Sequence, residues 1–310
     1  MTAPSLYQQV TAALVAELDR GVAPWVQPWS AAPRRLPYNV ATGHRYQGVN
    51  VLLLWQAAWV KGYPSPAWIG YDQARRLGGY VQREEKATLI VYGSRYLPAR
   101  ERDKPAAEQR WVPFLKPRRV FNLAQTANLP PRCHPAGEVK PLPVALAEAE
   151  TFLTTLGANV LHGGDRAFYA PRLDLIVLPE PARFHTAGDY VATSLHEHGH
   201  WSGHPSRLHR DFSGRFSDRS YAEEELVAEL TAAYLCARLA VPGKLRHAEY
   251  LGHWVDLLKA DAQAIFTAAA RATEAARYLE QQGGLPSEDA ASEDDEADAA
   301  ATETTLPEAA

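Results

Sequence analysis

The chain has 310 residues, of which 46% are hydrophobic, and its 32 basic and 36 acidic residues give a formal net charge of −4. This length suffices for two domains, and the apolar share is typical of a folded protein, which excludes a wholly disordered chain. Two cysteines, Cys133 and Cys236, are too few and too far apart for a disulfide framework or a cysteine-based metal site.

The sequence also indicates a chain that stays out of membranes. Its longest apolar run, residues 49–60, is interrupted by Asn50 and Gln56 and is too short to span a bilayer. The N-terminus has no cleavable signal pattern, and two widely separated cysteines suit a reducing compartment. We therefore expect a cytoplasmic protein without membrane contact.

The overall charge hides an uneven distribution. Residues 281–310 contain nine acidic and no basic residues, so the rest of the chain carries 32 basic against 27 acidic residues. Residues 1–140 alone contain 19 basic and nine acidic residues. The sequence thus predicts a basic N-terminal half and a disordered acidic tail over residues 281–310.

Several elements are predicted in the N-terminal half. Helical spacing of apolar residues predicts an amphipathic helix over residues 6–18, and residues 49–60 predict a buried helix that carries Trp55 and Trp59. A short helix is expected over residues 68–77, followed by a hairpin of residues 80–83 with residues 88–92 and a last strand over residues 119–123. The charged segment 98–108 has no apolar period and is expected to be an exposed insertion.

The same half combines aromatic and basic residues. Six of the eight tryptophans lie in residues 1–140, and we expect Trp55, Trp59 and Trp111 to belong to the core. Elsewhere, basic and aromatic residues interleave as a groove for single-stranded nucleic acid requires, with cations for phosphates and ring faces on which bases stack. The candidate DNA-binding residues are Arg34, Arg35, Tyr38, Arg45, Tyr46, Arg95, Lys116, Arg118 and Arg119.

After a linker at residues 136–144, the C-terminal half begins with a predicted helix over residues 145–156. Residues 167–170 and 174–178 predict a hairpin beside the helix that follows. A long helix is expected from about residue 249 to residue 280.

The stretch 190–201 contains the spacing H-E-x-x-H, formed by His196, Glu197 and His200, after a capping pair of Thr186 and Asp189. In a helix, residues four apart lie on one face, so two imidazoles can take two corners of a zinc tetrahedron. Glu197 is offset around the helix and can reach the attacking water. This geometry indicates a zinc hydrolase.

A third ligand must come from elsewhere. His204 and His209 are candidates, but Ser206 stands where the longer metzincin pattern needs its third histidine. His198, two residues from each motif histidine, points elsewhere and is expected to be an outer-sphere or solvent-facing residue.

The helix predicted over residues 221–240, after the capping pair Ser220 and Glu223, offers a better ligand. Glu225 and Glu229 lie on one face with small residues, which would let another helix approach closely, and two acids there are costly without a cation. We expect Glu225 to be the ligand and Glu229 to orient a ligand histidine, with the reverse assignment open. Glu223 and Glu224 fit a solvated first turn.

The chain resembles a known family along most of its length. Residues 37–55, 69–93 and 118–126 are similar to the N-terminal domain of ArdC-type antirestriction proteins, a resemblance that covers about residues 5–130 and implies binding of single-stranded DNA. Residues 166–208 and 223–236 resemble the zincin-like metallopeptidase domain of that family. His196, Glu197, His200 and Glu225 match its metal site and catalytic base, whereas His198 replaces a small or apolar residue.

These observations predict an α+β protein with two domains. Residues 1–135 form the DNA-binding domain, residues 145–280 form the zincin-like domain, and zinc is the expected cofactor, with manganese as an alternative. Glu197 would act as catalytic base, and Tyr221 and His198 are candidates for the oxyanion donor.

Three functions remain open. The first is an antirestriction protein of a mobile element that binds single-stranded DNA and carries a zinc peptidase acting on a host restriction enzyme or another protein. The second is a non-proteolytic DNA-protecting protein with a structural metal, and the third uses the acidic tail as a DNA mimic. The oligomeric state is not predicted, and a primase is disfavoured because the sequence has no polymerase domain.

Overall fold

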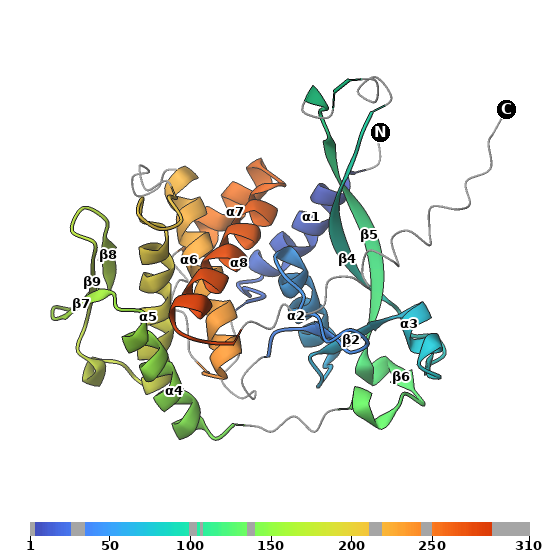
Figure 1. Ribbon diagram of the computed structural model, residues 1–310, viewed down its shortest axis with the longest axis horizontal. Coiled ribbons are helices and arrows are strands. Elements are labelled where there is room, and N and C mark those ends of the chain that lie inside the picture. The colour runs from blue at the N-terminus through green and yellow to red at the C-terminus, as the bar shows by residue number, and fades with distance from the viewer. Residues whose placement is uncertain are drawn as a thin grey trace.

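The structure is a computed structural model that describes residues 4–25, 35–98, 104–105, 108–134, 140–210, 219–242 and 250–286, without the side chains of residues 94–96 and 113. A mixed N-terminal part of helices and strands lies beside a mainly helical C-terminal part (Figure 1). The predicted α+β class is confirmed. In the described part of the chain, every helix is too short or too polar to cross a bilayer.

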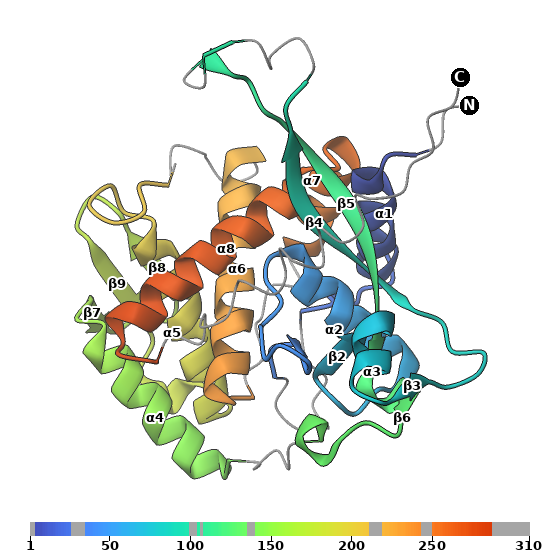
Figure 2. The same cartoon turned by 45° about the vertical axis from the view of Figure 1, so that its right-hand side comes forward.

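A four-stranded sheet with the strand order β1-β2-β5-β4 organises the N-terminal part. Its strands are β1 (Tyr38–Asn39), β2 (Ala67–Gly70), β4 (Thr88–Tyr96) and β5 (Val112–Asn122). The β4–β5 hairpin is long, and its far end projects away from the helices (Figures 1 and 2). The segment expected to be an insertion falls at this end, and residues 99–103 and 106–107 of it lie outside the described residues.

Helices and short strands complete this part. They are α1 (Leu6–Leu18), α2 (Val49–Lys61), α3 (Tyr71–Arg76), β3 (Tyr80–Val81), β6 (Thr126–Ala127) and the 3-10 turns η3 (Leu123–Gln125) and η4 (Pro131–Cys133). The predicted helices at residues 6–18 and 49–60 are confirmed. α1 is capped by Ser5, whose hydroxyl accepts a hydrogen bond from Gln8 N. α2 ends at Gly62, which has a left-handed backbone conformation that glycine adopts readily.

The C-terminal part combines a small sheet with helices. Its elements are α4 (Leu142–Thr155), β7 (Asn159–His162), β8 (Phe168–Ala170), β9 (Leu175–Leu178), η5 (Pro181–Arg183), α5 (Ala187–Ser202), α6 (Arg219–Leu239), α7 (Leu251–Ala260) and α8 (Ala264–Gln282). The sheet order is β7-β9-β8, and β8 pairs antiparallel with β9, which confirms the predicted hairpin. α6 packs against both α5 and α8.

A continuous hydrophobic core joins the two parts. It includes Leu52 of α2, Leu195 of α5 and Leu230 of α6, all completely buried. α1 packs against α7, and α2 against α8. The loop before α2 is also bonded to the C-terminal helices, because Gly48 N donates to Thr273 Oγ1 at 3.0 Å and Gly48 O accepts from Tyr234 Oη at 3.1 Å.

Three expectations for the N-terminal half are wrong. Residues 80–83 do not pair with β4, because β3 pairs with β6 and β4 takes β5 as its partner. The helix expected over residues 68–77 begins only at Tyr71, since Trp68 belongs to β2. Trp59 and Trp111 are 49% and 46% exposed, so of the three tryptophans assigned to the core only Trp55 is buried.

Three boundaries in the C-terminal half also differ. The linker expected over residues 136–144 ends earlier, because α4 begins at Leu142 and not at residue 145. The long helix expected after residue 249 is broken at Asp261, whose backbone is extended and whose carboxylate accepts a hydrogen bond from Gln263 N at 2.8 Å. The segment expected to be disordered begins at Gln281, yet α8 continues to Gln282 and Leu285 packs against the core. Residues 287–310 lie outside the described residues.

Candidate metal centre

Close packing of α5 against α6 creates the site. α5 begins at Thr186, whose hydroxyl accepts a hydrogen bond from Asp189 N at 3.0 Å, as the capping pair predicts. A Cβ atom on Gly199 would lie 3.1 Å from Ala228 Cα, so glycine on α5 and the small residues of α6 permit this approach. Ser220, expected to cap α6, instead lies within that helix.

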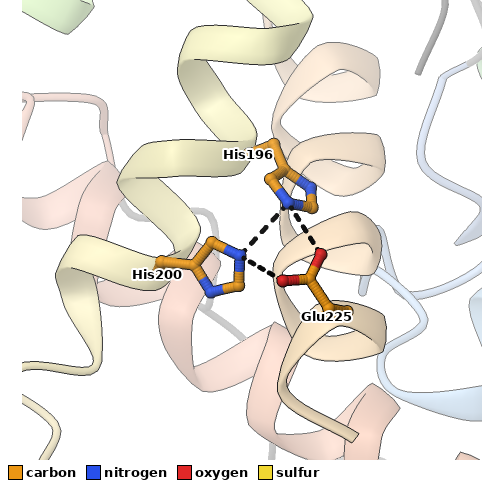
Figure 3. A group of neighbouring side chains, drawn as sticks. All are labelled: His196, His200 and Glu225. Atoms are coloured by element: carbon orange, nitrogen blue, oxygen red, sulfur yellow. Dashed lines mark hydrogen bonds and ion pairs between the residues drawn. The ribbon is translucent and has the colours of Figure 1, made fainter. Parts of the chain in front are cut away.

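Two imidazoles and one carboxylate converge between these helices (Figure 3). The Nε2 atoms of His196 and His200 lie 3.2 Å apart. Glu225 Oε2 lies 3.5 Å from His196 Nε2, and Glu225 Oε1 lies 3.4 Å from His200 Nε2. The ligand atoms of the three residues lie within 4.8 Å of one another, which makes them a candidate metal-binding group.

The rival histidines do not join this group in the described part of the chain. The Nδ1 atom of His204 lies 2.7 Å from Ser206 Oγ, within its own turn. His209 has a positive φ of 51° in the loop that follows and also lies outside the group.

A second layer of carboxylates surrounds the imidazoles. Glu229, whose exposed fraction is 0%, places Oε2 3.6 Å from His196 Nδ1. Glu224 Oε1 lies 3.2 Å from His200 Nδ1. Each ring therefore directs Nε2 toward the common point and Nδ1 toward a carboxylate, the arrangement that orients metal-binding histidines.

The expectation that Glu224 lies on a solvated first turn is wrong. Its carboxylate is buried and accepts hydrogen bonds from Arg210 Nε at 3.0 Å and Nη2 at 2.9 Å. Arg210 also donates to Ser202 Oγ at 3.0 Å and to Gly199 O, so it ties the end of α5 to the start of α6. No local pattern separates Glu224 from Glu223, because its partner lies fourteen residues away in a loop.

The buried carboxylates favour positive charge between the rings. Burial opposes protonation of His196, but the carboxylates of Glu225 and Glu229 outweigh it and raise the pKa to about 10. Burial likewise opposes protonation of His200, while Glu225 and Glu224 raise its pKa to about 9. A divalent cation supplies this positive charge while both imidazoles stay neutral, so the donor set fits such a cation.

Glu197 lies on the same helix and is also buried. Burial raises the pKa of its carboxyl group, against the effect of the two imidazoles and of a hydrogen bond from the backbone of Tyr169 on β8. β8 therefore lies directly beside Glu197, and α5 contacts both β8 and β9.

The two candidate oxyanion donors differ in position. His198 is neither at the metal site nor solvent-facing, because it is 1% exposed, its Nδ1 donates to Ser194 O at 2.7 Å, and its ring packs edge-on against Trp201. The hydroxyl of Tyr221 lies 3.1 Å from that of Tyr250. Burial, then the hydrogen bond with Tyr250 and the nearby charge of Glu225, raise the pKa of Tyr221, so its hydroxyl stays protonated beside the candidate ligand.

The candidate DNA-binding residues fall in two places. Lys116, Arg118 and Arg119 lie on β5 opposite Tyr92, Ile90 and Leu89 of β4. Because side chains alternate along a strand, Lys116 and Arg118 share one face of the hairpin and Arg119 lies on the other. Arg95 is in β4, but its side chain is outside the described residues, as is the whole of Arg34.

The remaining candidates surround β1. Arg35 is exposed, Tyr38 is half-buried in β1, and the backbone of Arg45 forms an isolated bridge with Tyr38. Tyr46 is only 5% exposed and packs with Leu54. The ring of Tyr46 is therefore not offered to a base at the open surface.

Comparisons with known proteins agree with this architecture. The family model described as the N-terminal domain of the anti-restriction factor ArdC matches residues 4–121, and that of a zincin-like metallopeptidase matches residues 147–271. An uncharacterized protein, y4eC, of Sinorhizobium fredii (strain NBRC 101917 / NGR234) is 36% identical, covering 91% of this chain and 93% of its own. A DNA primase TraC of Escherichia coli is 38% identical over 86% of this chain, which spans only 26% of that primase.

Two solved structures share the fold. The metal-free crystal structure of the antirestriction ArdC protein from plasmid R388 has a TM-score of 0.76 and 36% identity, covering 91% of this chain and 99% of that one. Its Mn(II)-bound crystal structure has a TM-score of 0.73 and 37% identity, covering 90% and 98%. With both domains matched over nearly their whole length, the chain belongs to the family of ArdC antirestriction proteins.

Proposed function

We propose that His196, His200 and Glu225 bind a divalent cation and that Glu197 is the catalytic base of a peptidase-type site. The convergence of two Nε2 atoms and one carboxylate on a common point carries this proposal. Zinc accepts such a ligand set, with a fourth position left for water or substrate. The Mn(II)-bound structure of the R388 protein supports manganese as the alternative.

Geometry favours Glu225 over Glu229 as the ligand. Glu225 faces the Nε2 atoms of both histidines, whereas Glu229 faces only the Nδ1 atom of His196. An imidazole that binds a cation through Nε2 carries its proton on Nδ1, which then needs an acceptor. Glu229 and Glu224 supply these acceptors, so we assign them to holding the two rings.

The reaction we infer is hydrolysis of a peptide bond. A bound cation would supply a Lewis acid that polarises the scissile carbonyl and increases the acidity of an attacking water. Glu197 accepts the proton of that water and passes it to the departing amine nitrogen. Tyr221, protonated beside Glu225, is the better placed candidate for a hydrogen bond to the developing oxyanion.

We further propose that the N-terminal part binds single-stranded DNA through the β4–β5 hairpin. On one face, Tyr92 is 37% exposed directly opposite Lys116, whose Nζ lies 5.5 Å from the centroid of the Phe114 ring. Arg118 follows Lys116 on this face, so two cations lie beside two aromatic rings that can stack on bases. In the antirestriction role of the family, this binding would direct the site toward a restriction enzyme or another protein on the same DNA.

The substitution Glu197→Gln tests the catalytic proposal. It removes the base without removing a ligand, so bound metal should be retained while hydrolysis of a peptide library is lost. Glu223→Gln, the same change at a partly exposed position of α6, is the control and should retain both. Loss of metal in Glu197→Gln would contradict the assigned role.

Glu197→Gln also distinguishes a proteolytic from a non-proteolytic antirestriction function. Retained protection of DNA against restriction by Glu197→Gln would favour a structural metal in a non-proteolytic protein. Removal of residues 287–310 tests the acidic tail as a DNA mimic, and unchanged protection would eliminate that role.

The DNA proposal is tested by reversing charge on the hairpin. Lys116→Glu with Arg118→Glu should weaken binding of a single-stranded oligonucleotide and reduce the salt dependence of that binding, because two phosphate contacts are removed. Arg166→Glu with Arg172→Glu, in the C-terminal part, is the control of equal charge change. Tighter binding of duplex than of single strands would overturn this proposal.

A further inference from the structure

A cavity of about 450 Å³ lies where the two parts of the protein meet. The N-terminal side contributes Arg45, Tyr46 and Gln47, and the C-terminal side contributes Tyr234 of α6 and Arg277 of α8. Its volume falls within the usual range of small-molecule sites. None of the lining residues belongs to the metal-binding group or to the base, so the cavity is separate from the hydrolytic site.

The cavity combines apolar walls with positive charge. Leu36, Val51 and Ala276 line it together with the two tyrosines. Its one acidic residue, Glu280, has its carboxylate 3.6 Å from Arg238 Nε. The lining residues include two arginines, Arg45 and Arg277, against this one acid, so together they carry a net positive charge.

This chemistry selects a class of ligand. Guanidinium groups bind phosphate through paired N–H donors. Aromatic and apolar walls suit a planar base, and the lining includes Gln47 and Gln281, whose side-chain amides contain both donors and acceptors for a polar edge. A molecule with one phosphate and one base matches all three features.

The loop that carries Arg45 and Gln47 is held in place before any ligand arrives. Gly48 N donates to Thr273 Oγ1 of α8, and Gly48 O accepts from Tyr234 Oη of α6. Thr273 and Tyr234 also line the cavity. The binding wall is therefore preorganised across both parts of the protein, which lowers the entropic cost of binding.

We propose that this cavity binds a nucleoside monophosphate unit, either one nucleotide of a DNA strand or a free nucleotide. Tyr46, buried beneath the open surface, then acts as part of the wall rather than as an exposed stacking platform. In its strand-bound form the proposal rests on the single-stranded DNA binding proposed above. Tyr46 packs in one cluster with Ile90 of β4 and Val120 of β5, which places the cavity near the base of the hairpin.

The test uses the full chain with Arg277→Glu and a matched control, Arg271→Glu. Both arginines are exposed on α8, and both substitutions change the charge equally, but only Arg277 lines the cavity. A third variant, Arg277→Lys, keeps the charge and loses the paired donors. Circular dichroism checks that each variant is folded.

Binding is measured with four probes: a labelled oligothymidylate with a 5′ phosphate, the same strand without it, thymidine monophosphate, and inorganic phosphate. Arg277→Glu should weaken binding of the nucleotide-containing probes by about tenfold or more, and Arg277→Lys should weaken it less. Arg271→Glu should leave the affinity for these probes within about threefold of the wild-type value. A loss confined to the 5′-phosphorylated strand assigns the cavity to a strand end. A similar loss for both strands assigns it to an internal nucleotide.

Other outcomes separate this proposal from the proposed function. If Lys116→Glu with Arg118→Glu abolishes strand binding while Arg277→Glu changes nothing for any probe, the hairpin function stands and the cavity proposal fails. Equal weakening by Arg277→Glu and Arg271→Glu also overturns it, because only the overall charge would matter. If wild-type protein binds thymidine monophosphate but no strand, and Arg277→Glu loses that binding, the cavity is a free-nucleotide site and the single-strand function fails.

Discussion

Replacing Arg210 by methionine removes the partner of a buried carboxylate next to the candidate metal site. Arg210 and Glu224 are 8% and 7% exposed, and the guanidinium also donates to Ser202 and Gly199 on α5. Removing one partner of such a pair leaves an uncompensated buried charge and costs about 3–5 kcal/mol. That is a large share of the roughly 5–15 kcal/mol by which natural proteins are stable.

Urea unfolding of the protein, after a chelator has removed bound metal, measures this loss in the free energy of unfolding. A double-mutant cycle with Glu224→Gln isolates the interaction energy between the two side chains. The double variant Arg210→Met/Glu224→Gln should recover much of the loss, because no buried charge is left unpaired. Arg219→Met, which removes a surface partner of Glu223 and Asp261, is the control and should leave stability nearly unchanged. A loss below about 1 kcal/mol for Arg210→Met, or no recovery in the double variant, would refute this reasoning.

Two further predictions concern α5 and the β8–β9 turn. Gly199→Ala should lower the melting temperature and weaken manganese binding. Overpacking against Ala228 costs about 1–3 kcal/mol of folding free energy, which exceeds the gain of about 1 kcal/mol from the higher helix propensity of alanine. Gly252→Ala, where a Cβ meets nothing within 4 Å, should instead stabilise α7, and a stabilised Gly199→Ala protein would contradict the close contact. The hydrogen bond from Arg207 holds the pKa of Asp174 below its usual value, so this pair stabilises the fold above about pH 4 and loses its contribution as the pH falls through the lowered pKa. Asp174→Asn should therefore have a lower melting temperature than wild type at pH 7 but not at low pH, and a constant difference across this range would count against the pair.

The sequence predicts best those features that depend on residues close together in the chain. The spacing of His196 and His200 places both imidazoles on one face of α5, and Thr186 marks where that helix begins. The small residues on one face of α6 predict its close approach to α5, as the contact between Gly199 and Ala228 shows. Helical periodicity and capping are local properties, so a single sequence contains them.

Features set by distant partners could not be predicted in the same way. The strand that begins at Thr88 has its partner in β5, beyond the hairpin's far end, whereas residues 80–83 are nearer in the chain and local signals favour pairing with them. Glu224 is buried against partners from other segments of the chain, Arg210 and His200. Trp59 lies on the exposed side of α2 although its hydrophobicity favours the core, since the packing of α2 on neighbouring elements decides which face is covered.

The metal content of purified protein tests the central claim most directly. After dialysis against zinc or manganese, wild-type protein should retain about one divalent ion per chain, and His196→Ala and Glu225→Ala should retain essentially none. Glu223→Ala, which removes a carboxylate on the outer side of the same helix, should retain the wild-type amount. Wild-type protein that holds no divalent ion, or a Glu225→Ala variant that binds it as tightly as wild type, would contradict the assignment of these three side chains as the metal site.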